Sequence, residues 1–119
     1  MLIKSEDKGD YTILSPIGKE KKGSDQILED FFSDLKEKIS TFSNSNLILD
    51  FSQVVNTDVT KILLFSPLSG KQKEVNRSFV IVSHGIDADE IPEDLLVVPT
   101  LQEAIDIIDM ENIERDLGI

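Results

Sequence analysis

Three short apolar runs in the second half of the chain constrain its fold more than any other feature. They occupy Leu47–Asp50, Phe79–Val82 and residues 95–98, and each holds three or four consecutive apolar residues between polar segments. Such runs are typical of strands buried on both faces of a parallel sheet. The segments between them are long enough for the crossover connections that parallel strands require. The pattern therefore predicts neighbouring parallel strands in an α/β domain.

The first half of the chain predicts a hairpin and one amphipathic helix. Residues 1–7 and 11–17 read as strands around a Lys-Gly-Asp turn, and a polar connection follows at residues 18–23. We expect Ser24 or Asp25 to be the N-cap of the helix. Its apolar side has helical spacing and is made of Ile27, Leu28, Phe31, Phe32, Leu35, Ile39 and Phe42.

Two further helices are predicted, one after the first apolar run and one after the last. One starts at residues 56–58, and Pro67 should kink or end it because proline removes a backbone donor and clashes with the preceding turn. The other starts at Thr100, which forms a capping box with Glu103. The whole order predicts one α/β domain over residues 1–119, with a mixed β-sheet, parallel core strands and α-helical crossovers.

The charge of the chain is strongly acidic and unevenly distributed. The net charge is −11, from 12 basic and 23 acidic residues. From Ile86 onwards Arg115 is the only basic residue, against eleven acidic ones: Asp87, Asp89, Glu90, Glu93, Asp94, Glu103, Asp106, Asp109, Glu111, Glu114 and Asp116. This surface would repel a phosphate backbone, so we expect no direct nucleic-acid binding. It suits either a solubilising role or a basic protein partner.

Basic residues gather in only two places, and we expect both to be solvent-exposed loops: Lys19, Lys21 and Lys22, and Lys71, Lys73 and Arg77. The start of the chain lacks the apolar region of a signal peptide, and no apolar run is long enough to span a membrane. The chain also has no cysteine. We therefore expect a cytoplasmic protein with no membrane partner.

The residues that most enzymes use for catalysis are scarce. The single histidine, His84, follows a strand and is expected in a turn, and the six glycines form no phosphate-binding motif. Metal-ion and nucleophilic catalysis both lack their usual residues. We therefore expect no cofactor, no metal ion, no catalytic residues and no enzymatic activity. A small enzyme with an unrecognised carboxylate pair is the least favoured alternative, because such pairs converge in space rather than in sequence.

Three segments resemble the STAS domain family, the fold of the anti-sigma-factor antagonists. Residues 47–54, Leu-Ile-Leu-Asp-Phe-Ser-Gln-Val, are similar to the family's apolar strand ending in Asp-x-Ser-Gly-Val. Phe79–Val82 is similar to its next core strand, and residues 98–104 resemble its closing strand-to-helix junction. The resemblance covers most of the chain from Leu47 onwards. It implies a bacterial regulatory module that binds a protein partner, an anti-sigma factor or a related kinase.

The family's regulatory motif is an Asp-Ser-Ser-Gly or Asp-Ser-Thr-Gly turn at a helix start, where a partner kinase phosphorylates a hydroxyl group. Counting from Asp50 matches Asp58 to the motif's aspartate and Thr60 to the phosphoacceptor. Val59 stands in place of the first hydroxyl residue, and Lys61 in place of the glycine. The resemblance implies four partner-binding residues, with Thr60 as candidate phosphoacceptor: Thr57, Asp58, Thr60 and Lys61.

Two alternatives to this switch stay open. The chain could be a constitutive adaptor or assembly subunit that kept the fold and lost the phosphoswitch, which Val59 and Lys61 favour. The helix start could also be purely structural, with Thr57 as N-cap and Asp58 stabilised by the helix dipole. Residues 113–119 additionally resemble small Bacteroidetes proteins sometimes named ribonuclease Z. That nuclease needs a histidine-rich metal site, so this resemblance implies only a link between the adaptor and an RNA-processing nuclease.

Overall fold

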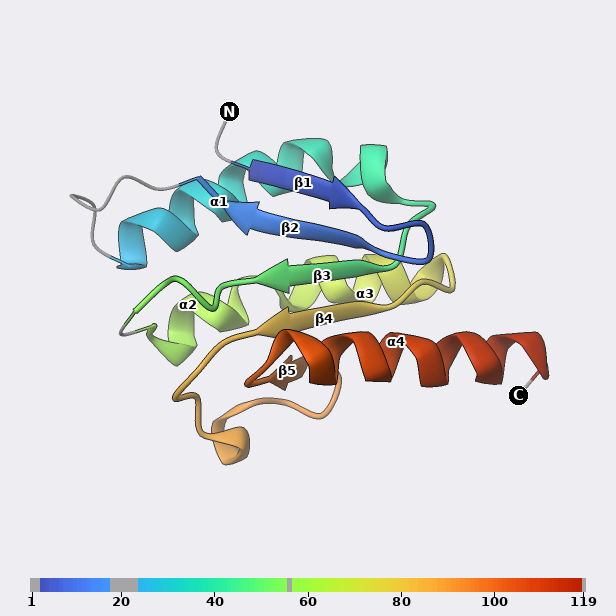
Figure 1. Cartoon of the computed structure of the whole chain (residues 1–119). Helices are drawn as coiled ribbons and strands as arrows, with labels where there is room; N and C mark the ends of the chain where they lie inside the picture. The colour runs from blue at the N-terminus through green and yellow to red at the C-terminus, as the bar shows by residue number, and fades with distance from the viewer. Residues whose placement is uncertain (1–2, 18–23, 56, 119) are drawn as a thin grey trace.

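A five-stranded mixed sheet forms the centre of the structure, with its strands in the order β1-β2-β3-β4-β5 (Figure 1). The computed structural model describes residues 3–17, 24–55 and 57–118. The strands are β1 (Ile3–Asp7), β2 (Thr12–Pro16), β3 (Leu47–Asp50), β4 (Phe79–Val82) and β5 (Leu96–Val98). The first two are antiparallel and all other pairs are parallel, as predicted. The α/β fold class expected from the sequence is confirmed.

Helices cover both faces of this sheet. Behind it in Figure 1 lie α1 (Ser24–Lys38), α2 (Val59–Leu63) and α3 (Ser66–Glu74), and in front lies α4 (Leu101–Asp116). Two short 3₁₀ turns complete the elements, η1 (Ile39–Phe42) after α1 and η2 (Ala88–Glu90) before β5. Within the described ranges, every helix is too short or too polar to cross a membrane. The predicted connection at residues 18–23 and the predicted caps Ser24 and Asp25 lie outside the described residues and side chains.

Burial on two sides explains why the apolar runs form the central strands. Side chains alternate along a strand, so Leu49 and Ile81 pack among α1, α2 and α3, whereas Ile48 and Val80 pack beneath α4. All four side chains are fully buried. A strand covered on both faces needs apolar residues at every position, which is why these runs are continuous.

Pro67 ends one helix and begins another. The helix α2 stops at Leu63, as the proline predicted, but α3 starts at Ser66 with Pro67 in its first turn. A proline is tolerated there because the missing N–H group would have no partner within the helix. The sequence did not predict α3, because its sequence is polar and contains Gly70.

One expectation about the polar segments was wrong. Lys71 and Lys73 lie on α3 rather than in a loop, and Arg77 alone of that basic group follows the helix. The buried face of α3 includes Gln72, whose side-chain amide donates to the carbonyl oxygen of Ser45 at 2.9 Å. A buried polar contact of this kind does not produce apolar periodicity, so the polar sequence of α3 predicts a loop instead.

Four phenylalanine rings join α1, α2 and α3 to the sheet. Phe65 packs with its ring centroid 5.9 Å from Phe31, 5.4 Å from Phe32 and 5.4 Å from Phe51. Phe31 and Phe51 meet edge to face at 5.1 Å. Such geometries are favoured between aromatic rings and add to the free energy gained by burial. The cluster fixes the middle of α1 beside the junction between α2 and α3.

The two edges of the sheet differ in charge. At β1, the ammonium groups of Lys4 and of Lys8, which follows the strand, flank the carboxylate of Glu6, each at 3.4 Å. By contrast, β5 consists of Leu96, Val97 and Val98 and carries no charge. Charged side chains on an edge strand discourage pairing with another strand. Charges therefore discourage pairing with a further strand at β1, and no charge on β5 does so.

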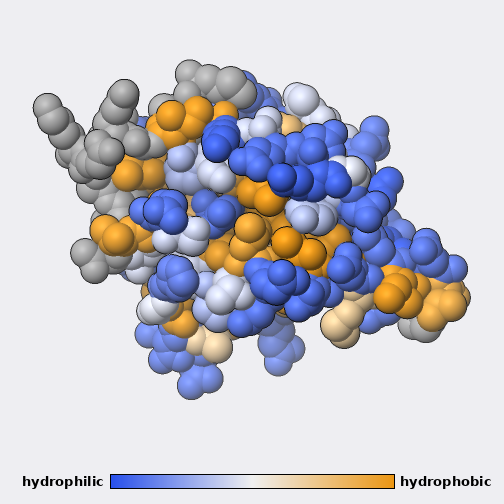
Figure 2. All heavy atoms as spheres, viewed as in Figure 1, coloured by the Kyte–Doolittle hydropathy of each residue, from blue (hydrophilic) through white to orange (hydrophobic). Residues whose placement is uncertain are grey.

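Hydrophobic side chains also reach the surface at the free end of α4. Met110, Ile113 and Leu117 are 61%, 58% and 68% exposed. Figure 2 shows hydrophobic residues at this end of the molecule, apart from the larger group over the middle of the sheet. The first half of α4 buries Ala104 and Ile108 against the sheet, so its two halves have different environments.

Candidate functional site

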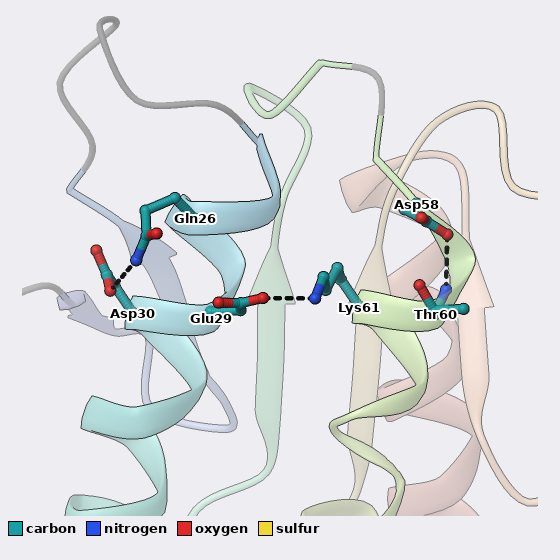
Figure 3. A network of polar contacts seen from close by, with 6 residues as sticks. All are labelled: Gln26, Glu29, Asp30, Asp58, Thr60 and Lys61. Atoms are coloured by element: carbon teal, nitrogen blue, oxygen red, sulfur yellow. Dashed lines mark hydrogen bonds and ion pairs between the residues drawn. The ribbon is translucent and has the colours of Figure 1, made fainter.

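The four residues expected to bind a partner lie together around the start of α2. The chain reaches this position from β3, through residues 51–58, so the site stands beyond the carboxyl end of a central parallel strand. Ligand sites in open α/β sheets are commonly found at that end. Thr60 and Lys61 belong to α2 itself, and Asp58 immediately precedes it (Figure 3).

Asp58 is the N-cap of α2. Its backbone is extended, with φ −86° and ψ 133°, and its Oδ1 accepts a hydrogen bond from the Thr60 backbone N–H at 3.0 Å. The expectation that Thr57 caps the helix was wrong, since its hydroxyl donates to the Val54 carbonyl oxygen at 3.2 Å. A carboxylate makes a charge-assisted bond to the backbone, which is stronger than the bond a threonine hydroxyl would make.

Hydrogen bonding lowers the pKa of Asp58 below the usual value for aspartate. The largest cause is the Thr60 backbone N–H, followed by the Thr60 side-chain hydroxyl. Slight desolvation acts in the opposite direction, and the charge of Lys61 adds a smaller lowering. The carboxylate is therefore ionised at neutral pH and faces the hydroxyl that was predicted as phosphoacceptor. A phosphate on Thr60 would meet a like charge at this position.

Lys61 connects α2 to α1. Its Nζ lies 2.5 Å from the Oε1 of Glu29, and the two side chains are 26% and 46% exposed. In Figure 3 the Lys61 side chain extends toward α1 and away from Asp58. One turn of α1 also holds a bond from the Gln26 amide to Asp30 at 2.8 Å. Lys61 therefore bridges two helices.

The surface around these residues combines polar and apolar groups. Val55 precedes the helix and is 72% exposed, the largest exposure among the large hydrophobic side chains described. Asp58 and Thr60 are exposed beside it. An exposed apolar side chain next to oriented hydrogen-bonding groups is a composition found at protein contact surfaces.

Sequence reasoning missed a second polar cluster, at the opposite end of the central strands. Arg115 of α4 donates to Asn46 Oδ1 and Ser78 Oγ, each at 3.2 Å, and to Asn112 Oδ1. The buried Asn46 amide also accepts from the Ser78 N–H at 2.8 Å. A polar cavity of about 550 Å³ adjoins the cluster and is lined by both arginines of the chain, Arg77 and Arg115. These side chains provide hydrogen-bond partners for one another, and they connect α4 to the starts of β3 and β4.

The remaining chemistry is sparse. His84 is exposed in a bend after β4, as its position in the sequence predicted. Among the described residues, no three side chains of the metal-binding types gather into a site for an ion. No protein-family model matches the sequence, and no curated protein matches it either.

Proposed function

We propose that the chain is a non-catalytic regulatory module of the STAS type that binds a protein partner at the start of α2. The resemblance to that family lies in β3, β4 and the junction between β5 and α4, and these are the central strands and a capped helix start of an α/β sheet. The observation that carries the proposal is the exposed pair formed by Asp58 and Thr60, held in a fixed geometry at the position where the resemblance implies partner contact.

The rigidity of this surface supports a binding role. The cap bond orients Asp58, the ion pair with Glu29 orients Lys61, and the phenylalanine cluster holds both helices from below. A surface that is already ordered loses less conformational entropy when a partner binds. By resemblance, the partner is an anti-sigma factor or a related kinase.

A constitutive adaptor without a phosphoswitch is the second candidate. It is favoured by Val59, which stands in place of the motif's first hydroxyl residue, and by Lys61, which occupies the position of the motif's glycine. A side chain at that position prevents the close backbone approach that glycine allows. The link to an RNA-processing nuclease belongs to this candidate.

The test begins with a pull-down from native cytoplasm, read by mass spectrometry for both the partner and any phosphate on Thr60. Affinity for that partner is then measured with Asp58→Ala, Thr60→Asp, Thr60→Val and Lys61→Glu. We expect Thr60→Asp to change affinity by about tenfold, since it adds a charge at the contact. If no kinase acts, Thr60→Val should bind within about twofold of the parent. Thr41→Asp, at an exposed threonine of η1, is the matched control.

Each variant must first keep a cooperative thermal transition, because Asp58→Ala removes a helix cap. A phosphate on Thr60 would support the switch, whereas partner binding without it would support the adaptor. If all four variants bind like the parent, the contact lies elsewhere and the acidic α4 becomes the next surface to examine.

A further inference from the structure

A cavity of about 410 Å³ lies along β5. Five consecutive residues, 95–99, line it, together with Ser83 at the end of β4 and residues of the loop that carries η2. The cavity therefore lies beside the last strand of the sheet and extends past the end of β4. It also stands at the carboxyl ends of β4 and β5, where α/β proteins commonly bind ligands.

The backbone of β5 is unpaired on this side. β5 is the last strand of the sheet, and its inner edge pairs with β4. In the described part of the chain, no backbone hydrogen bond joins its outer edge to another segment. Free N–H and C=O groups on an uncharged edge form a template for an added strand.

A buried hydroxyl without a partner points to an occupant of the cavity. Ser83 is 3% exposed, and its Oγ has no hydrogen-bond partner among the described residues. Its backbone N–H donates to the Val98 carbonyl oxygen at 2.9 Å, so the residue is fixed between β4 and β5. Buried polar groups are nearly always paired, since an unpaired one loses its hydration without compensation. A polar group of a bound molecule would supply the missing partner.

The loop that helps to line the cavity is acidic, which indicates the charge of the occupant. The segment between β4 and β5 carries five acidic residues and no lysine or arginine: Asp87, Asp89, Glu90, Glu93 and Asp94. Glu93 lines the cavity itself. Lys73 of α3 donates to the Asp94 carbonyl oxygen at one end of the loop. A complementary segment would carry positive charge.

We propose that the outer edge of β5 and its cavity bind an extended segment of a partner protein, in which apolar residues alternate with lysine or arginine. The segment pairs with β5 as a sixth strand, places one apolar side chain in the cavity, offers a backbone polar group to Ser83 Oγ, and meets the acidic loop with its charges. A second copy of this chain does not fit the site, because it presents the same acidic loop beside its own β5. The surface is distinct from the one at α2.

The probe is a soluble nine-residue peptide of alternating lysine and valine, titrated into the full chain and followed by amide NMR shifts. We expect the shifts to be confined to residues 83–99. Two further peptides carry N-methyl groups on either the valine or the lysine nitrogens. Only one of those nitrogen sets faces β5, so one peptide should keep its affinity and the other should lose about tenfold or more.

Protein variants separate strand pairing from general attraction between opposite charges. Ala88 lines the cavity and is exposed, so Ala88→Trp should block it, whereas Thr41→Trp on η1 should not. Glu93→Lys should weaken binding about tenfold, and the same charge change in Asp109→Lys on α4 should leave it within about threefold. Thr60→Asp should have no effect on peptide binding. The proposal for β5 can therefore fail independently of the proposed partner surface at α2.

The proposal is overturned if both N-methylated peptides bind like the parent peptide, or if Glu93→Lys and Asp109→Lys weaken binding equally. Either result would mean that the acidic chain attracts any basic peptide. It is also overturned if the shifts centre on α4 or on α2.

Discussion

The Lys61 ammonium group lies 2.5 Å from a carboxylate oxygen of Glu29, a residue 32 positions earlier in the chain. The contact joins α2 to the second turn of α1. It also turns the lysine away from Asp58, so the two charged groups of the candidate site act in different directions. Asp58 faces the helix backbone, and Lys61 holds a neighbouring helix.

This ion pair should contribute little to stability. Exposed pairs typically contribute about 0.2–1 kcal/mol, because water screens the charges and both side chains lose freedom. A double-mutant cycle with Lys61→Ala, Glu29→Ala and the double variant, followed by urea unfolding, measures the coupling. A coupling energy above about 2 kcal/mol would show that the contact is better shielded than its exposure indicates.

The pKa of Asp58 should be measurably low. Its folded pKa lies below the unfolded value, so the ionised cap stabilises the fold above the ordinary aspartate pKa. That contribution is lost as the pH falls through the lowered pKa. NMR titration of the side-chain carboxyl should show this, and Thr60→Val should move the pKa back toward the usual value because one hydrogen bond is removed. A pKa in the folded chain at or above that of an unstructured peptide would contradict the cap.

Two buried serines at opposite ends of β4 should respond differently to the same substitution. Ser78 Oγ accepts from Arg115 and contacts the Glu111 carboxylate, so Ser78→Ala should cost about 1–3 kcal/mol. Ser83 Oγ makes no such bond in the described structure, so Ser83→Ala should be neutral or slightly stabilising. Urea unfolding of both variants gives the comparison. Equal destabilisation would mean that Ser83 has a partner, contrary to the role given to it at β5.

Phe65 should be among the most sensitive positions of the core. It is fully buried and contacts three other rings, so Phe65→Ala should cost about 3–5 kcal/mol through lost burial and a cavity. Phe65→Leu fills part of the space and should cost less. Phe42→Ala, at a partly buried ring outside the cluster, is the matched control and should cost less than Phe65→Ala. Chemical denaturation monitored by circular dichroism measures all three.

Much of the sheet could be predicted because burial on both faces leaves continuous apolar runs. The strands β3 and β4 match their predicted bounds, and β5 starts one residue later than expected, at Leu96. Thr100 caps α4 by accepting from the Glu103 N–H at 3.2 Å, as the capping box predicted. The reciprocal bond from the Glu103 carboxylate is not among the hydrogen bonds of the described residues.

What could not be predicted depends on contacts between distant residues. The buried side of α3 is completed by Gln72, which bonds to backbone carbonyls 27 and 30 positions away. Asn46 lies 69 positions from Arg115, yet the two share a hydrogen bond. At the candidate site, Asp58 and Thr60 were placed correctly near the helix start, but the choice of cap and the bridge to Glu29 depend on local angles and on a second helix.

The contrast between the two sheet edges limits how the chain can assemble. An open-ended fibre of stacked sheets requires two different edges that accept each other, so that every added copy leaves a new edge free. In this chain the second edge strand, β1, is charged, and its charges discourage pairing with the β5 strand of another copy. The charges at β1 therefore oppose edge pairing between copies of the chain. The chain can offer an uncharged edge to a partner without becoming a template for its own polymerisation.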